Sequence, residues 1–279
     1  MKISTIVKRS VLSLAVTTAV VLSAGSTALA AQIPYDGDYD TLPSPTTPAF
    51  NIYTNVPRGI DNEAEFVRLR ASNGNPIDAG TTGERNSLYK NNLDVACKVG
   101  DMFDVRTYIH NGADADNNED GNGSAVAHGV KLAMTGPFGT KAKQFVFGST
   151  ITASNASTVT DSGTLNCGSD VQLEIVPTSL HIFTRTLGWR VADVKNVNGT
   201  LSIGSKVFGD GNVWACWDER IQVVYTVKVN AVPETPKETP KETPKVLPKT
   251  GAGSTLAIFA ATTLVGTLLY RVRAQRSEA

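Results

Sequence analysis

An alternation of apolar and other side chains over residues 221–229 constrains the fold of this 279-residue chain more than any other feature. The apolar series is Ile221, Val223, Tyr225, Val227 and Val229, and the residues between them are Gln222, Val224, Thr226 and Lys228. Successive side chains of a β-strand point to opposite faces, so a period of two is typical of a strand with one buried face. We therefore expect a half-buried strand here.

The same period runs through residues 102–110 and, over a shorter span, through residues 171–175. Further candidate strands lie at residues 50–56, 66–71, 130–135, 145–153 and 201–203, separated by clusters of Gly, Asn, Asp and Pro. No stretch of the body shows a helical period over ten residues. The pattern predicts an all-β fold, an antiparallel β-sandwich at residues 49–230, built as one elaborated sandwich or as two small ones.

The segments on either side of this body have different compositions. Residues 1–30 carry Lys2, Lys8 and Arg9 before an apolar run and end in Ala28-Leu29-Ala30, which predicts a signal peptide with a short helix and cleavage before Ala31. An uncleaved N-terminal membrane anchor is the alternative. Residues 31–48 are rich in Pro, Asp, Thr and Ser and predict an extended leader.

The segment after the body repeats Glu-Thr-Pro-Lys three times within residues 231–246. A proline at every fourth position removes amide donors and fixes φ, so neither helix nor sheet is expected. We expect a semi-rigid polyproline II stalk on the order of 50 Å long. Residues 254–270 are mostly apolar and uncharged, and residues 271–279 contain three arginines, which predicts a transmembrane helix with a cytoplasmic tail.

Leu247, Pro248, Lys249, Thr250 and Gly251 stand directly before that apolar segment. Together with the apolar segment and the basic tail, they resemble the wall-sorting signal of the LPxTG type over the last 33 residues, and every fixed position matches. The resemblance implies that a sortase cleaves between Thr250 and Gly251 and joins Thr250 to an amine of peptidoglycan. The apolar segment is then a temporary membrane anchor of the precursor. A chance match on a plain membrane anchor is the alternative.

Short motifs in the body also resemble a family. They are Val99-Gly100-Asp101, Tyr108-Ile109-His110-Asn111-Gly112, Val126-Ala127 and the segment Asp210-Gly211-Asn212-Val213-Trp214-Ala215-Cys216-Trp217. They look like the extracellular Ig-like domains of wall-anchored proteins in very small epibiotic bacteria. The resemblance implies an Ig-like β-sandwich on the cell surface and no known catalytic residue.

Residues 31–251 contain 20 basic and 25 acidic residues, a net charge of −5. A mildly acidic exported body argues against nucleic acid as a partner. The sequence contains no catalytic motif, so we expect no enzyme; the alternative is a hydrolase whose carboxylate pair comes from distant strands. We expect a wall-anchored display protein for adhesion to an unidentified host-cell or bacterial ligand, with the loop at residues 109–127 as the first candidate. The alternatives are a coat or pilin-like subunit and a surface hydrolase.

Candidate metal and disulfide residues are few. Cys97, Cys167 and Cys216 allow three single-bridge pairings, among which the sequence does not choose. Asp116, Asn118 and Asp120 fit the first half of a calcium loop, but Ala127 stands where a bidentate Glu is needed. Calcium is thus one interpretation, and a solvated turn with no cofactor is the other.

The three histidines, His110, His128 and His181, could meet at a metal only through the fold. Hydrogen-bonded surface positions near strand ends are the simpler interpretation. Trp214 and Trp217 flank Cys216 and indicate either core packing or an aromatic ligand platform.

Overall fold

The computed structural model of the chain describes residues 32–34, 42–55, 61–75, 88–215 and 217–232. Strands make up 47% and helices 6% of these described residues, and each helix among them is a three-residue 3₁₀ turn, which confirms the all-β prediction. The predicted signal helix, stalk, sorting motif and transmembrane helix lie outside the described residues. Within these ranges, no helix is long and apolar enough to cross a membrane.

The chain divides into two compact units, Met1–Pro233 and Glu234–Ala279, and every described residue belongs to the first. Its strands are β1 (Ile33–Pro34), β2 (Tyr53–Thr54), β3 (Val67–Ala71), β4 (Asn92–Val95), β5 (Met102–Ile109), β6 (Lys131–Thr135), β7 (Ala142–Thr152), β8 (Val159–Ile175), β9 (His181–Thr184), β10 (Gly188–Val191), β11 (Thr200–Ser202) and β12 (Ile221–Asn230). The 3₁₀ turns are η2 (Ala115–Asn117), η3 (Glu119–Gly121), η4 (Val194–Asn196) and η5 (Trp217–Glu219).

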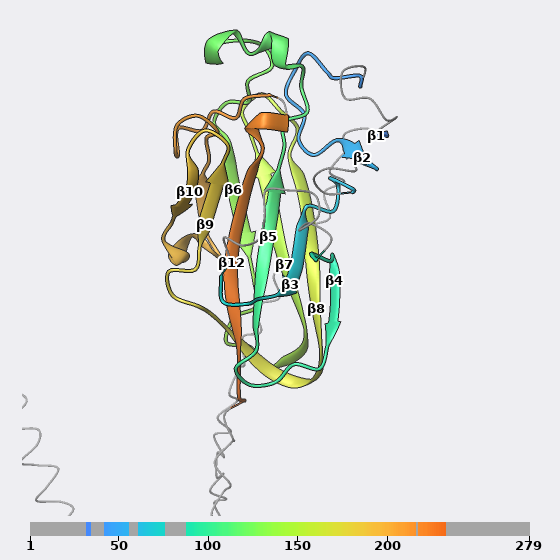
Figure 1. Cartoon of the computed structure of the whole chain (residues 1–279), viewed down its shortest axis with the longest axis vertical. Helices are drawn as coiled ribbons and strands as arrows, with labels where there is room; N and C mark the ends of the chain where they lie inside the picture. The colour runs from blue at the N-terminus through green and yellow to red at the C-terminus, as the bar shows by residue number, and fades with distance from the viewer. Residues whose placement is uncertain (1–31, 35–41, 56–60, 76–87, 216, 233–279) are drawn as a thin grey trace, which may run out of the picture. The chain divides into compact units, whose positions relative to one another are not determined.

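Ten strands, β3 to β12, form one curled sheet that folds into two facing layers (Figure 1). One layer has the order β10-β9-β12-β5-β3, and the other has the order β11-β6-β7-β8-β4. The pairing is antiparallel except between β4 and β8. β8 is long enough to join both layers, because it pairs with β7 and β4 over most of its length and with β12 at residues 172–175.

The main core lies between the two layers and is almost entirely aliphatic and aromatic. β5 contributes Phe103 and Val105, and β7 contributes Phe145 and Phe147, all at most 3% exposed. The hydroxyls of Thr107 and Ser149 lie 2.7 Å apart and make a polar contact across this core. Burial of apolar surface on this scale is the main source of stability for such a fold.

β5 and β12 are buried on both faces, so the prediction of half-buried strands was wrong for them. Their second face carries polar residues, and some of these form hydrogen bonds with residues of the same face. Asp104 accepts hydrogen bonds from Arg70 Nε at 2.9 Å and from Thr226 Oγ1 at 2.8 Å. On the same face, the guanidinium carbon of Arg106 lies 4.2 Å from the ring centroid of Tyr89. The two side chains form a cation–π contact.

A disulfide joins Cys97, just after β4, to Cys167 in β8. The parallel pairing of these two strands sets Val95 opposite Cys167, so register brings the two thiols together. The sequence left three pairings open, and the structure selects this one. Cys216 lies outside the described residues.

Candidate functional site

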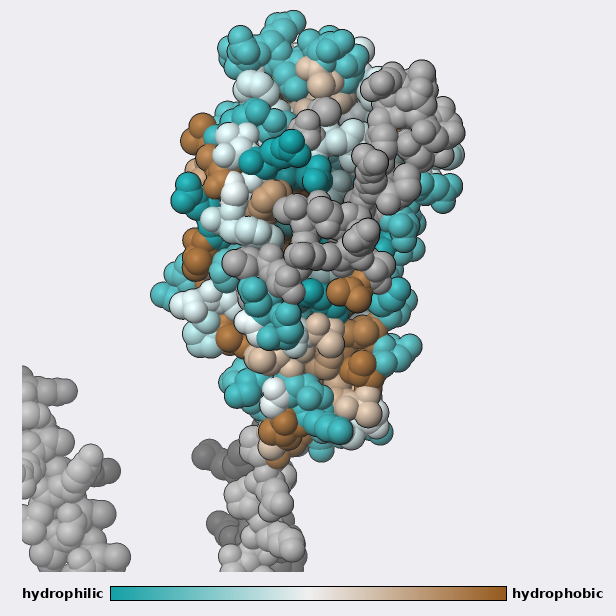
Figure 2. All heavy atoms as spheres, in the orientation of Figure 1, coloured by the Kyte–Doolittle hydropathy of each residue, from teal (hydrophilic) through white to brown (hydrophobic). Residues whose placement is uncertain are grey.

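One end of the body is built from the segment that follows β5 and the segment that precedes β12. We call this the loop end; it consists of residues 110–127 and 213–220 without residue 216. Ile109 at the end of β5 is paired with Ile221 at the start of β12, which places both segments at the same end of the layer. The loop end is hydrophilic (Figure 2), and η2 and η3 lie at its tip (Figure 1).

Asn111 holds these segments together from a buried position. Its Nδ2 donates to Ala125 O at 2.8 Å and to Val213 O at 3.0 Å. Its Oδ1 accepts from the amides of Ala49 and Ala113, both at 3.3 Å. One side chain therefore fixes three backbone segments relative to one another.

Asn118 makes a second tie within the loop end. Its Oδ1 accepts from Ala215 N at 2.9 Å, and its Nδ2 donates to Ala215 O at 3.3 Å. Asp114 accepts from Asp116 N at 3.0 Å and so caps η2. These bonds give the acidic tip a defined backbone conformation.

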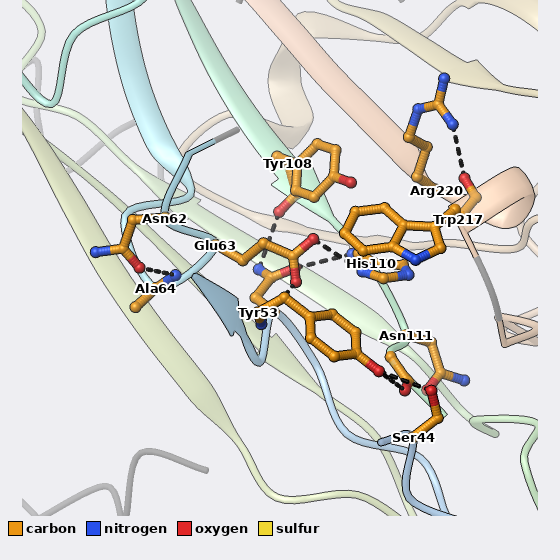
Figure 3. A network of polar contacts seen from close by, with 12 residues as sticks. Ser44, Tyr53, Asn62, Glu63, Ala64, Tyr108, His110, Asn111, Trp217 and Arg220 are labelled. Atoms are coloured by element: carbon orange, nitrogen blue, oxygen red, sulfur yellow. Dashed lines mark hydrogen bonds and ion pairs between the residues drawn. The ribbon is translucent and has the colours of Figure 1, made fainter. Parts of the chain in front are cut away.

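Beneath this tip lies a buried pair formed by His110 and Glu63 (Figure 3). His110 Nδ1 lies 2.8 Å from Glu63 Oε1, and the two side chains are 1% and 0% exposed. Glu63 Oε2 accepts from Tyr53 N at 3.1 Å, so both carboxylate oxygens have partners. His110 Nε2 is buried and has no hydrogen-bond partner among the described residues.

Aromatic rings surround the imidazole of His110. The Trp217 ring centroid lies 4.2 Å from that of His110 and 5.4 Å from that of Tyr53. Tyr53 Oη donates to Gly112 O at 2.9 Å and lies 2.9 Å from Ser44 Oγ. Gly112 is required here, because a Cβ atom would lie 2.9 Å from the Tyr53 ring and 2.8 Å from Ile52.

These groups line a pocket of about 400 Å³. Its polar and aromatic wall consists of Ser44, Tyr53, His110, Asp114, Asp116 and Trp217. This volume lies within the range of small-molecule sites, about 300–1,000 Å³. We call it the loop-end pocket.

The electrostatic character of the loop-end pocket is acidic. Asp114 and Asp116 contribute carboxylates, and no lysine or arginine is among the described residues that line it. Arg220 is close by, but its Nη1 donates to Trp217 O at 2.7 Å and its guanidinium points away from Tyr53 and His110 (Figure 3). Burial, and then the negative charge of Glu63, raise the pKa of Tyr108 well above its ordinary value.

Some of the site residues that the sequence predicts are described by the structure, and others are not. Leu247, Pro248, Lys249, Thr250 and Gly251 lie outside the described residues, so the sorting motif stays a prediction. In the calcium candidate, the carboxamide of Asn118 is engaged with Ala215, and Asp120 is exposed. The part of the chain that the structure describes contains no group of three His, Cys, Asp or Glu side chains that could hold a metal.

The histidines do not come together, and one of them is not at the surface. His128 Nδ1 lies 2.9 Å from Asn212 Oδ1, and His181 Nδ1 lies 2.8 Å from Ser179 O. His110 is buried, so the prediction of a surface position was wrong for this residue. Trp217 lines the pocket, whereas the Trp214 ring lies 5.0 Å from Lys206 Nζ.

No local pattern in the sequence indicates that Ser44, Tyr53 or Glu63 belongs to a site. Ser44 belongs to the segment predicted as a leader, and Leu42 of the same segment is 6% exposed in a cluster with Ile52 and Tyr53. The described part of this segment therefore packs against the body. Only contacts across the fold bring these residues to His110.

A scan against protein-family models finds no matching family, and searches of curated proteins and of solved structures find no match either.

Proposed function

We propose that this chain is a cell-wall-anchored surface protein, a sortase substrate that displays an Ig-like β-sandwich for adhesion or cell–cell contact. The sorting motif at residues 247–251 supports the anchoring part of the proposal. Two facing, mainly antiparallel layers support the sandwich part. The proposal includes no catalytic step by this chain.

The observation that carries the display part is the direction of β12. This strand starts at the loop end with Ile221 opposite Ile109, and it runs to Lys228 opposite Met102 and on to Asn230. Nine residue steps of about 3.3 Å separate Ile221 from Asn230, or about 30 Å. The chain therefore leaves the body at the end remote from the loop-end pocket, and the Glu-Thr-Pro-Lys repeats and the sorting motif follow in sequence.

The proposed attachment exchanges one acyl bond for another. The sortase cysteine attacks the Thr250 carbonyl, the bond to Gly251 breaks, and Thr250 becomes a thioester. An amine of a peptidoglycan precursor then displaces the thiol and forms an amide. Pro248 presets φ and Gly251 leaves the scissile carbonyl accessible, which lowers the cost of docking the motif.

The disulfide between Cys97 and Cys167 is consistent with export, because disulfides persist in oxidising compartments outside the cytosol. The localisation that we propose is the outer face of the cell wall. The partners are then sortase and peptidoglycan during attachment and a ligand on another cell afterwards.

Murein extraction from the protein's own cells tests the anchoring. The wild-type chain should resist hot detergent and be released by a muramidase, and Thr250→Ala should move to the membrane fraction. Lys249→Ala is the matched control, because Lys249 occupies the variable position of the motif and should stay wall-bound. Murein attachment of Thr250→Ala equal to that of the wild type would contradict the proposal.

The oligomeric state separates display from the structural alternative. A displayed adhesin should be monomeric while its cells bind target cells. Ordered polymers at high copy, without binding to any target cell, would favour the coat or pilin-like subunit instead.

A further inference from the structure

His110 Nε2 is buried and has no hydrogen-bond partner among the described residues, although buried polar atoms nearly always have one. An unsatisfied buried nitrogen costs stability, and such groups are typical of functional sites. Glu63 holds Nδ1 at 2.8 Å, so the ring cannot rotate freely to find another partner. His110 itself is part of the pocket wall.

The aromatic side of the loop-end pocket narrows the class of ligand. Tyr53 and Trp217 stack with ring centroids 5.4 Å apart, and Trp217 is only partly buried. The part of the Trp217 ring that stays open to solvent suits a ligand with one apolar face. Sugar rings have such a face of C–H groups, and hydroxyls around the rim.

The polar side of the pocket narrows the class further. Carboxylates accept hydrogen bonds only, so Asp114 and Asp116 suit hydroxyl or ammonium donors. An anionic ligand would meet two like charges with no lysine or arginine among the described lining residues to offset them, which costs affinity. The hydroxyl of Ser44 adds a group that both donates and accepts.

We propose that the loop-end pocket binds a neutral or amino-bearing sugar ring at the end of a surface glycan. The sugar stacks on Trp217, donates hydroxyl or ammonium hydrogen bonds to Asp116, and lies beside the imidazole of His110 in the pocket wall. This inference rests on the proposed display function and names the class of ligand that the displayed body recognises. Sialylated and phosphorylated glycans are excluded by the acidic wall.

The test uses the full-length chain in a detergent without a sugar head group. It is applied to an array of immobilised glycans that end in neutral hexoses, amino sugars, sialic acid or phosphorylated sugars. Binding should be confined to the neutral and amino-bearing set. Binding confined to the sialylated or phosphorylated set, or to none, would overturn the inference.

Two variants test whether the sugar binds in the loop-end pocket. Asp116→Ala should weaken binding of the best free monosaccharide by about tenfold or more, because a hydrogen bond to a carboxylate is lost. Glu119→Gln lies on the same loop, outside the pocket wall, and should bind as the wild type does. Equal affinity of Asp116→Ala and wild type would overturn the assignment of the pocket.

A spectroscopic readout avoids any loss of folding through mutation. In ¹⁵N-histidine-labelled chain, the Nε2 signal of His110 should shift on titration with that sugar, and the signals of His128 and His181 should not. The His128→Gln and His181→Gln variants assign the peaks. A shift of neither His110 nitrogen at saturating sugar would contradict the inference.

Failure of this inference is distinguishable from failure of the proposed function. A chain that is joined to murein and mediates contact between cells, yet binds no sugar, overturns only the ligand class. A chain that binds sugar in the pocket but is not joined to murein overturns only the anchoring.

Discussion

His110 Nδ1 lies 2.8 Å from Glu63 Oε1, and this contact joins the end of β5 to the segment between β2 and β3. Both side chains are buried, so the pair stabilises the floor of the loop-end pocket from inside the protein. Tyr53 N donates to the other oxygen of Glu63, which ties β2 to the same carboxylate. The pocket thus depends on a residue that does not itself line it.

Removal of Glu63 should destabilise the body strongly. Glu63→Ala leaves His110 Nδ1 and Tyr53 N without their acceptor, and we expect the free energy of unfolding to fall by about 1–3 kcal/mol for each group left unsatisfied. Glu63→Gln should cost less, because its amide oxygen still accepts one hydrogen bond. Denaturant unfolding followed by tryptophan fluorescence measures both.

The control for Glu63 is Glu65→Ala. Glu65 pairs with Arg68 at 3.3 Å, but its side chain is 45% exposed, so the loss should stay below about 1 kcal/mol. Equal losses for Glu63→Ala and Glu65→Ala would contradict the account of the buried pair.

Asn111→Asp should loosen the loop end. The aspartate cannot donate to Ala125 O or Val213 O, and it would set a carboxylate against two buried carbonyls. We expect a loss of about 2 kcal/mol or more in unfolding free energy and a loss of amide protection at residues 111–127 in hydrogen exchange. Asn196→Asp, which removes one exposed hydrogen bond, should change neither quantity much.

Asp161 should make stability depend on pH. Burial raises the pKa of its carboxyl to about 6, although the backbone amide of Val67 donates to it at 2.7 Å. The folded state therefore holds a proton that the unfolded state has lost between about pH 4 and pH 6. The contribution of Asp161 to stability is greatest below this window and is lost as pH rises through the folded pKa.

Asp161→Asn should flatten the stability profile between pH 4 and pH 6, since an amide does not titrate. Unfolding free energies measured at half-unit intervals of pH test this. Asp170→Asn, at an exposed position of the same strand, is the control and should keep the wild-type slope. A wild-type slope in Asp161→Asn would show that other groups cause it.

The disulfide determines how many free thiols the unreduced chain has. Because the chain has three cysteines and Cys97 is joined to Cys167, the denatured, unreduced chain should titrate with one thiol, and Cys216→Ser should titrate with none. The bridge closes a loop across a sequence separation of 70, so its loss in Cys97→Ser should cost about 4 kcal/mol. Three free thiols in the unreduced wild type would contradict the assignment.

The sequence pattern predicted the strands that carry a regular period or a β-rich composition. β3, β5, β6, β7, β11, β12 and the last part of β8 fall where alternation or apolar content placed strands. The candidate at residues 50–56 shrinks to the two-residue β2, because Asn51 and Asn55 have φ of 53° and 61°, which interrupts an extended chain. β4, β9 and β10 were missed, because four residues are too few to show a period.

The first part of β8 was also missed. Its alternation is interrupted by Gly163 and Gly168, which are poor strand formers. Gly163 is nevertheless needed, because a Cβ atom would lie 2.7 Å from Leu69 Cδ1 and from Val67 O on the facing β3. Close packing between the two layers requires glycine at position 163. A local sequence pattern does not show this requirement.

Only part of the candidate site could be predicted from the sequence. The loop at residues 109–127 was predicted as a binding region, and Trp217 was considered as an aromatic platform; both contribute to the pocket. Glu63 and Tyr53 were not predicted, because their contacts with residues 110–112 and with Trp217 are long-range in sequence. Ser44 was not predicted either, because it joins the site through the hydroxyl of Tyr53. Such contacts depend on the strand order of the fold, which no local motif specifies.

The most direct test of the account is the C-terminus of the mature protein. The chain is isolated from muramidase-digested walls of its own cells, cut with a protease, and its last peptide is analysed by mass spectrometry. We predict a peptide that ends at Thr250 and carries an amide-linked muropeptide. A mature chain that still ends at Ala279 would contradict sortase attachment.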